Sequence, residues 1–306
     1  MTCEDGAWPA TVSIGIPTFN RAAGLERALE SCRAQTHPRL EIVVSDNAST
    51  DGTADLCRRL SAADDRIRVV RQDRNVGLDA NFRAVLERAT GTYFMWLADD
   101  DWLDPEYVAV CVAALLDDPQ AVIAGGEVEY ALDGSSFRDS LRPCVGASPR
   151  RRILAYLGTV SLNGSLCGVM RRADAYAAEW PDTLSGDWYF MAQIATRGRM
   201  LVEPSVLVHR SLSGGSSDMR ALARSYGVAP GWGRNIHVWT IRLLVPPLWA
   251  GRTSFGLMSR RERVWTALLL VPLLTARWVI SMLLRQPHAY RALRLVRRGV
   301  RRGLGR

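Results

Sequence analysis

The chain of 306 residues is long enough to bury a sizeable core, and it exceeds the usual size of a single domain. Its hydrophobic content of 48% and its charged content of 23% are both ordinary for a globular protein. Eight of the 39 basic residues and none of the 31 acidic residues lie in residues 285–306, so 31 basic residues balance 31 acidic residues elsewhere. A neutral body with a basic tail argues against a globally nucleic-acid-binding surface and for a local anionic partner.

The cysteines and the N-terminus bear on the cellular compartment. The six cysteines are widely scattered without a C-x-x-C pair, and several lie in apolar or helical contexts, so we expect reduced, buried thiols. The first ten residues, MTCEDGAWPA, have neither a basic start nor an apolar run, and no signal peptide is expected. These features predict that any catalytic part of the chain stays in the cytoplasm.

Hydrophobic periodicity alternates between two periods from residue 11 to residue 130. Short apolar runs predict strands over 11–16, 40–45, 67–72, 92–98 and 121–130. Apolar residues three and four positions apart predict helices over 21–35, 49–63, 78–90 and 105–116. Asp104, before Pro105, is expected to cap the last of these helices. This alternation implies βαβ units, so we predict an α/β fold with a mostly parallel sheet flanked by helices.

Four polar segments come directly after the predicted strands. They are PTFN (17–20), DNAST (46–50), DRNVG (73–77) and DDD (99–101). In parallel α/β sheets, ligands bind beyond the carboxyl ends of the strands. Because all four segments carry Asp, Asn or Thr, their coincidence predicts a polar ligand site at one edge of the sheet.

The second half of the chain is less regular. Periodicity weakens over 131–160, which predicts a loop or an insertion. A helix is expected from Ser185 to Gly198 and a strand over 200–211. The segment SGGSSDM (213–219) is typical of a flexible loop.

From about residue 236 the chain becomes strongly apolar. The segment 264–284 is 21 residues long with Arg277 as its only charge, so it has the length needed to span a bilayer. An arginine at bilayer depth costs roughly 2.5–3.5 kcal/mol on insertion scales. The arginine-rich tail that follows suits an anionic lipid surface. We therefore expect 236–306 to be an apolar, basic helical extension that associates with a membrane.

Three consecutive carboxylates, Asp99, Asp100 and Asp101, follow the predicted strand TYFMWLA. A solvated turn or a helix cap is the simple alternative, but Asp104 is already available as the cap. Hard divalent cations such as Mg²⁺ or Mn²⁺ prefer carboxylate oxygens and are usually shared with a substrate phosphate. The cluster therefore predicts a metal site.

Asp46 directly follows the strand EIVVS. Its carboxylate is suited to accept a hydrogen bond from a base imide or a sugar hydroxyl. By itself DNAST is an ordinary Asx-rich turn, so the functional interpretation depends on the neighbouring aspartates.

The order of these segments resembles that of a known family. The nucleotide-sugar-binding half of the family 2 glycosyltransferases is similar to VSIGIPTFNRAAGLERALESCRAQTHPRLEIVVSDNASTDGT and to NVGLDANFRAVLERATGTYFMWLADDDWLDPEYV. The resemblance covers about residues 11–130 strongly and extends more loosely to about residue 215. It implies a GT-A (Rossmann-like) domain over 1–235, in which 11–130 bind the nucleotide sugar and 131–235 bind the acceptor.

The resemblance implies donor-binding roles for the strand exits. The loop that lines the nucleotide base and ribose is matched by Pro17, Thr18 and Asn20. Asp46 matches the aspartate that binds the base, usually uracil or another pyrimidine. The segment beside the diphosphate and ribose is matched by Asn75, Gly77 and Asn81.

The resemblance also implies a metal site for Mg²⁺ or Mn²⁺. Asp99 matches the residue that faces the ribose or sugar, and Asp100 matches the ligand of the metal that holds the diphosphate. Many relatives have an aspartate at the position of Ala98, so Asp101 shares or replaces one of these roles in the alternative register. His209 matches a histidine that touches the metal or diphosphate in some relatives, although a lone histidine at a strand end is more often only a polar terminus.

A base for the acceptor is expected in the second half. Family members place an Asp or Glu near the start of a later helix, and Asp187 in LSGDWYFMAQI is similar in placement. The helix N-terminus would stabilise its carboxylate, and the alternative is that Asp187 only caps the helix. Trp188 is a candidate for stacking on a sugar. One displacement with one base inverts the anomeric carbon.

The sequence therefore predicts an inverting, metal-dependent glycosyltransferase that acts on a lipid-linked or cell-envelope glycan at the inner face of a membrane. A nucleotidyltransferase that makes an activated sugar is one alternative, but PTFNRAAGLE lacks the Gly-rich basic loop of that class. A nucleic-acid-binding protein is the other, and the neutral body and apolar stretches favour a lipid surface over nucleic acid.

Overall fold

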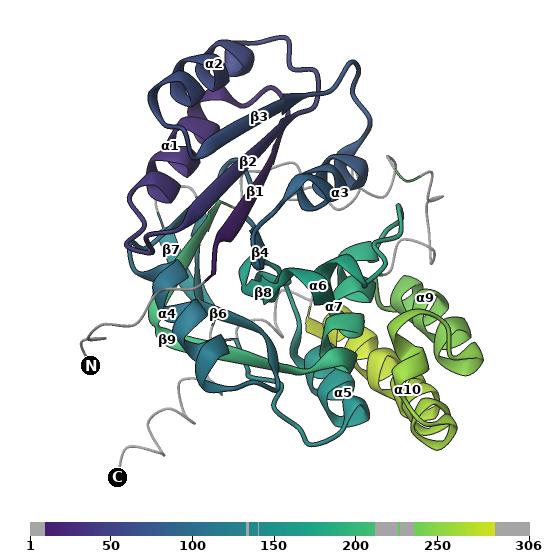
Figure 1. Ribbon diagram of the computed structural model, residues 1–306. Coiled ribbons are helices and arrows are strands. Elements are labelled where there is room, and N and C mark those ends of the chain that lie inside the picture. The colour runs from purple at the N-terminus through teal and green to yellow at the C-terminus, as the bar shows by residue number, and fades with distance from the viewer. Residues whose placement is uncertain (1–9, 133–134, 140, 212–225, 227–235, 285–306) are drawn as a thin grey trace.

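Strand β1 lies near the middle of the parallel half of one large sheet (Figure 1). The computed structural model describes residues 10–132, 135–139, 141–211, 226 and 236–284. Within those residues the sheet has nine strands in the order β3-β2-β1-β4-β8-β6-β9-β5, with β7 paired to β6. The strands are β1 (Val12–Thr18), β2 (Leu40–Asp46), β3 (Ile67–Arg71), β4 (Tyr93–Trp96), β5 (Trp102–Leu103), β6 (Ala121–Leu132), β7 (Ser135–Asp139), β8 (Val169–Arg171) and β9 (Arg199–Ser211).

The predicted α/β sheet flanked by helices is confirmed. Strands β1 to β4 are mutually parallel, as the alternating pattern predicted. Strand β8 then pairs antiparallel with both β4 and β6, and β6 pairs parallel with β9. The sheet is therefore parallel from β3 to β4 in the strand order and mixed beyond β4.

The helices cover both faces of the sheet. They are α1 (Ala22–Arg33), α2 (Thr53–Ala63), α3 (Leu78–Arg88), α4 (Tyr107–Asp117), α5 (Pro149–Thr159), α6 (Arg172–Tyr176), α7 (Gly186–Arg197), α9 (Ile236–Ala250) and α10 (Arg260–Leu284). Ile14 packs with α1 and α4 in one core, and Val43 packs with α3 in another. This division follows from strand geometry, because successive side chains point to opposite faces.

Two local expectations were wrong. The stretch 131–160 is more ordered than its pattern indicated, since it contains β7 and α5. Asp104 does not cap α4 with its side chain, because Glu106 holds the cap position and the Asp104 carboxylate accepts a hydrogen bond from the Leu207 backbone. Asp104 therefore ties the start of α4 to strand β9.

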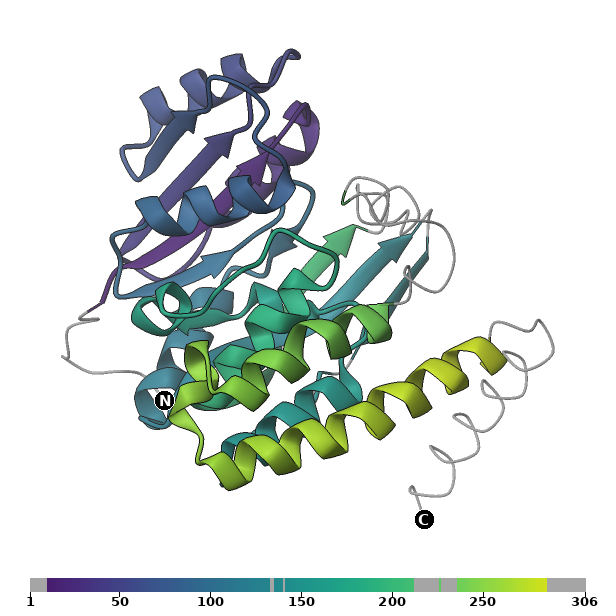
Figure 2. The same cartoon turned by 90° about the vertical axis from the view of Figure 1, so that its right-hand side faces the viewer.

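Helices α9 and α10 lie side by side and pack against α7 and α5 (Figure 2). Leu244 and Leu248 of α9 share a core with Leu270 and Leu274 of α10 and with helix α7. Among the described residues, one helix, Arg260–Ser281, is long and apolar enough to cross a membrane. The predicted loop at 213–219 and the basic tail at 285–306 lie outside the described residues.

The five described cysteines are all free and buried, as expected for reduced thiols. Burial is the main cause that raises the pKa of the Cys57 thiol to about 11. Such thiols stay protonated at neutral pH and are poor nucleophiles. They belong to the core and not to the candidate site.

Candidate active site

The carboxyl ends of β1, β2 and β4 meet at one edge of the sheet. Thr18, the last residue of β1, is paired in register with Asp46, the last residue of β2. The Thr18 hydroxyl donates a hydrogen bond of 2.8 Å to Asp99, which follows β4. The structure therefore brings together three of the polar strand exits, as the topology predicted.

Asp99 and Asp100 form the centre of this edge. Arg21, just after the β1 exit, donates to the Asp100 carboxylate at 2.6 Å and approaches the Asp99 carboxylate at 3.6 Å. Helix α1 begins next to this turn, and a Cβ added at Gly24 would lie 2.6 Å from the Asp99 carbonyl oxygen. Glycine at position 24 thus lets the helix backbone approach the aspartates closely.

Asp101 points into the protein instead. Its side chain is 1% exposed. It accepts hydrogen bonds of 3.0 Å from the Arg210 guanidinium and from the Ser211 backbone. With both oxygens engaged, Asp101 anchors the end of β9 in this arrangement, and metal ligation would require it to leave these partners.

Burial raises the pKa of two of the three aspartates. The pKa of Asp99 rises to about 6, mainly by desolvation, and the Thr18 hydroxyl and Arg21 oppose the rise. The pKa of Asp101 also rises to about 6 by desolvation, opposed chiefly by Arg210. Crowded carboxylates with raised pKa values gain stability from any added cation.

The loops after β1 and β2 are tied to each other. Asn20, in a left-handed conformation at φ 52°, accepts a hydrogen bond of 2.7 Å from the Thr50 backbone. Asp46 accepts one of 2.9 Å from the Ser49 backbone and pairs with Arg71 at 3.0 Å. The Asp46 carboxylate is therefore held by two partners at the end of β2, beside the loop that is predicted to line the nucleotide base.

The remaining polar segment, which follows β3, is held by amide side chains. The Asn75 carbonyl oxygen accepts hydrogen bonds from the Asn47 side chain and the Gly77 backbone, both at 2.9 Å. Gly77 has φ 92° and precedes α3, a conformation that favours glycine. Asn81 is buried. Its side-chain carbonyl accepts a hydrogen bond of 2.7 Å from the Ser45 hydroxyl, and its amide group donates to the Ser45 backbone carbonyl at 3.0 Å.

Asp187 lies in the first turn of α7 and is partly buried. Asn163 donates a hydrogen bond of 2.7 Å to its carboxylate, and the Tyr156 hydroxyl in turn donates to Asn163 at 2.8 Å. Desolvation raises the pKa of Asp187 above its ordinary value, while Asn163, backbone amides and the charge of Arg210 oppose the rise. Arg210 thus interacts with Asp187 as well as with Asp101, which links the base candidate to the aspartate turn.

The position of Trp188 argues against the predicted sugar stacking. The side chain is 3% exposed, and its ring packs against His237 at 5.7 Å. The Arg277 guanidinium covers the ring at 5.8 Å. Trp188 follows Asp187 on a helix whose successive side chains diverge by about 100°, so it points into the core.

His209 is held by two carboxylates. One ring nitrogen lies 2.9 Å from Asp104 and the other 3.0 Å from Glu129. The ring stacks on Trp102 at 5.1 Å, and Arg27 stacks on Trp102 at 3.8 Å. A metal could be ligated by His209 only after one of these hydrogen bonds is broken.

The residues at the sheet edge fit a divalent cation. Within the ranges that the structure describes, no three His, Cys, Asp or Glu side chains gather as a complete metal cage. Mg²⁺ is commonly held by one or two carboxylates together with substrate phosphates, and Asp99 and Asp100 supply that donor set. Arg21 already contacts both carboxylates, which indicates that the pair attracts positive charge.

Three important side chains were not predicted as site residues. Arg21 directly follows PTFN, so its proximity to the first strand exit was the available signal. Asn163 lies in the Asn-Gly step of SLNGSL, which indicates only a turn. Arg71 ends β3 beside Asp46, a relation that follows from parallel pairing of β2 and β3.

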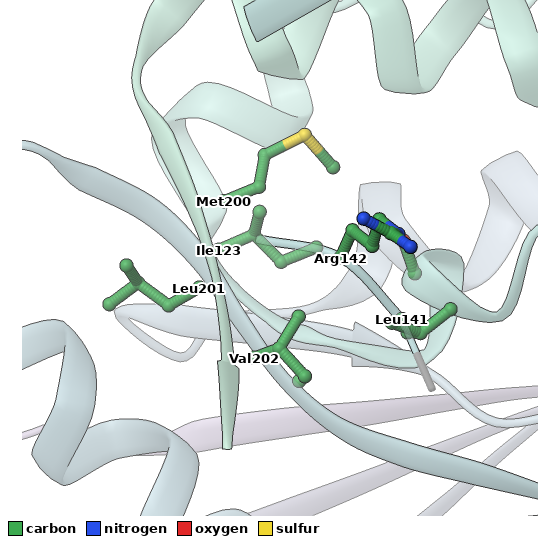
Figure 3. A pocket seen from close by; sticks show the side chains of 8 residues that line it. Ile123, Leu141, Arg142, Met200, Leu201 and Val202 are labelled. Atoms are coloured by element: carbon green, nitrogen blue, oxygen red, sulfur yellow. The ribbon is translucent and has the colours of Figure 1, made fainter. Parts of the chain in front are cut away.

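A small hollow lies elsewhere, between β6, β9 and the segment at 141–142 (Figure 3). Its volume is about 260 Å³, including space open to solvent. It is lined by Ile123, Gly125, Leu141, Arg142, Ser165, Met200, Leu201 and Val202. None of the predicted site residues lines it, so it is not the candidate active site.

Comparison with known proteins agrees with this geometry. The family model described as "Glycosyl transferase family 2" matches residues 13–178, more than half of the chain. The chain therefore belongs to glycosyl transferase family 2. The match includes the strand exits up to the aspartate turn.

A curated relative and two solved structures are similar. The GalNAc(5)-diNAcBac-PP-undecaprenol beta-1,3-glucosyltransferase of Campylobacter jejuni is 39% identical over 93 residues, which are 30% of this chain and 30% of that protein. S. aureus TarS 1–349 in complex with UDP-GlcNAc has a TM-score of 0.64 at 16% identity, over 86% of this chain and 72% of that chain. The mannosyltransferase PcManGT of Pyrobaculum calidifontis, in complex with GDP-Man and Mn²⁺, has a TM-score of 0.52 at 18% identity, over 92% and 83%.

These similarities differ in what they establish. The two structural likenesses confirm the GT-A architecture of the fold. The chain spans less than half the length of the curated relatives that it matches.

Proposed function

We propose that this chain transfers a sugar from a nucleotide-diphosphate sugar to a hydroxyl of a lipid-linked or cell-envelope glycan, with inversion at the anomeric carbon. The observation that carries the proposal is the contact of Thr18 with Asp99 at an edge that also holds Asp46 and Asp100. Membership of glycosyl transferase family 2 favours it over nucleotidyl transfer or nucleic-acid binding.

The donor occupies the sheet edge in this proposal. Asp46 and the loop at Pro17, Thr18 and Asn20 bind the base and ribose, with a pyrimidine as the expected base. Asn75, Gly77 and Asn81 lie beside the diphosphate, and Asp99 faces the ribose or sugar. Arg21 is placed to move from the aspartates to the diphosphate, since a guanidinium binds phosphate oxygens as well as carboxylates.

A divalent cation, Mg²⁺ or Mn²⁺, would be held by Asp100 with the help of Asp99. When bound, it neutralises the charge that develops on the departing nucleoside diphosphate. The Mn²⁺ complex of the similar mannosyltransferase supports this choice of ion. The raised pKa of Asp99 and the contact of Arg21 with both carboxylates fit the same conclusion.

Asp187 acts as the general base for the acceptor hydroxyl. Its raised pKa brings the carboxyl closer to the operating pH, which strengthens it as a proton acceptor. Asn163 holds the carboxylate in one orientation. The proton passes from the acceptor hydroxyl to the carboxylate as the oxygen attacks the anomeric carbon opposite the diphosphate.

The acceptor is proposed to be presented at the cytoplasmic face of a membrane. The similar glucosyltransferase carries a polyprenol diphosphate in its name, which supports a lipid-linked acceptor. The apolar helix α10 supports a membrane location. The catalytic half lies outside the bilayer in this arrangement.

The first test is a screen of nucleotide sugars for binding and hydrolysis in the presence of Mn²⁺. Asp100→Ala should weaken Mn²⁺-dependent donor binding at least roughly tenfold, because it removes the principal metal ligand. Asp65→Ala, an exposed carboxylate on the same domain, is the control and should bind normally. Full donor binding and turnover by Asp100→Ala would remove the metal assignment.

The second test separates the base from the donor site. Asp187→Asn keeps the size of the side chain but cannot take a proton, so kcat for transfer should fall by roughly 10²–10⁴-fold. Calorimetric donor affinity should stay unchanged. Transfer at the native rate by this variant would refute the base role.

A further inference from the structure

We propose that the outer face of α10, with the exposed residues that join it to α9, docks on an anionic lipid bilayer and lies along its surface without crossing it. This inference extends the proposed function by naming the docking surface and the orientation of the helix. It depends on the packing of α10, on the exposed residues between α9 and α10 and on the charge of the sequence that follows, and it holds whatever sugar is transferred.

The exposed side of α10 is apolar, which reverses the usual pattern of a surface helix. The large apolar side chains on that side are 42–55% exposed, and they are Trp265, Leu268, Leu269, Val271, Val279 and Ile280. Their spacing of three and four residues places most of them on one face of the helix. An exposed apolar face of this kind on the surface of a protein marks an interaction site.

Arg277 is the only charged residue between 264 and 281, and its side chain points away from the exposed apolar face of α10. Arg277 donates a hydrogen bond of 2.6 Å to the Leu157 carbonyl and a second one to the Val160 carbonyl. These carbonyls end helix α5, where the helix dipole favours a cation. The internal partners of Arg277 fix the rotation of α10, so that its apolar side faces outward.

The link between α9 and α10 adds aromatic and basic groups. Trp249 and Leu257 are 65% and 64% exposed. Arg252, Arg260 and Arg261 are exposed in the same stretch. Tryptophan and arginine are favoured at the boundary between lipid tails and headgroups, and arginines attract anionic lipids.

The charge of the neighbouring chain also selects an anionic partner. The sequence after Leu284 contains eight arginines and no acidic residue. Each basic residue near an anionic membrane surface contributes on the order of 1 kcal/mol to attraction. A neutral apolar protein surface would not be selected by this charge.

Packing favours docking over spanning. A helix of 25 residues is about 37 Å long, which is enough to cross a bilayer. Crossing would however separate α10 from α5 and expose the Arg277 guanidinium to hydrocarbon. Lying in the interface keeps both the Arg277 contacts and the burial of Leu270 and Leu274.

The test is co-sedimentation of the full chain with vesicles of phosphatidylcholine containing about one third phosphatidylglycerol. Leu268→Ser with Leu269→Ser should weaken binding roughly tenfold or more, because burial of apolar surface in the boundary is lost. Leu116→Ser, at a 49% exposed leucine of α4, is the matched control and should bind as the native chain does. Pure phosphatidylcholine should bind the native chain more weakly.

Four results would overturn the proposal. The first two are the absence of vesicle binding by the native chain and unchanged vesicle binding by the double variant. The third is retention of the chain in the membrane pellet after alkaline carbonate. The fourth is a dimer, seen by light scattering, that the double variant abolishes while vesicle binding persists. The last would identify a second copy of the chain as the occupant. Donor hydrolysis measured without vesicles should be the same in native and double variant, so a failed docking surface is distinguishable from a failed enzyme assignment.

Discussion

At the scale of single residues, the properties of the site depend on what each carboxylate touches. Asp99 and Asp100 share Arg21, whereas Asp101 is enclosed by Arg210 and Ser211. Three adjacent residues with the same side chain thus have different environments. Their sequence position alone does not distinguish a metal ligand from a structural anchor.

The pH dependence of transfer should report on Asp187. The base must be ionised, so kcat should fall as pH falls through its raised pKa, at a higher pH than for an ordinary carboxyl. Asn163→Gly removes a hydrogen bond that favours the charged form, and glycine tolerates the φ of 50° at this position. We expect this variant to shift the acidic limb of the kcat profile to higher pH.

Tyr156→Phe is the control for that profile. It removes the hydroxyl that donates to Asn163 but keeps the bond from Asn163 to Asp187. The acidic limb should move less than in Asn163→Gly. If the acidic limb of the kcat profile were unchanged in Asn163→Gly, the role of Asp187 in proton transfer would be refuted.

At the scale of elements, the close approach of α1 to the aspartate turn shapes the proposed donor site. A Cβ added at Gly24 would lie 2.6 Å from the Asp99 carbonyl oxygen, so the first turn of α1 closely approaches the backbone of the aspartate turn after β4. The hydrophobic pattern of α1 predicted a helix but not this contact. The contact joins residues 75 positions apart in the chain, beyond any periodicity.

Gly24→Ala should therefore destabilise the protein despite the higher helix propensity of alanine. The new Cβ lies 2.6 Å from a backbone oxygen, and relief of that overlap should cost roughly 1–3 kcal/mol of unfolding free energy. Gly158→Ala in α5 is the matched case, because its nearest neighbour, Leu273 Cδ1, would be at 3.9 Å. Alanine there should be neutral or stabilising by up to about 1 kcal/mol.

Urea titration of both variants measures this difference. Donor affinity should fall only in Gly24→Ala, since Gly24 adjoins Asp99. Equal stabilities of the two variants would contradict the close approach of α1 to the turn.

At the scale of the whole molecule, the C-terminal helices share one hydrophobic core with α7. Leu244, Leu248 and Leu274 pack in the same cluster as Phe190 of α7, the helix that carries Asp187. The Arg277 side chain of α10 donates to a carbonyl near the C-terminus of α5, and α5 also packs on α7. The helices that carry the proposed membrane-docking face therefore support the helix that carries the proposed base.

Replacement of Arg277 tests this support. Arg277→Leu leaves the carbonyls of Leu157 and Val160 without their cationic donor, which should cost about 1–3 kcal/mol of unfolding free energy. For a chain of this size, that corresponds to a loss of several degrees in Tm by calorimetry in detergent-free buffer. Arg260→Leu, at an exposed position of the same helix, should change Tm by less than half as much.

The sequence by itself determined the family and the alternating strands and helices between residues 11 and 130, but it did not predict β5, β7 or α5. The segments at the strand ends could be predicted because hydrophobic periodicity is a local property of the sequence. Their convergence could be predicted because parallel strands place their carboxyl ends at one edge of the sheet. The roles of Arg21 and Asn163, the burial of Trp188 and the inward direction of Arg277 were decided only by tertiary structure. These features rest on contacts such as Arg210 with Asp101 and Arg277 with Leu157, which are 109 and 120 positions apart. Periodicity carries no information at such distances, because the packing of distant elements selects the partner of each side chain.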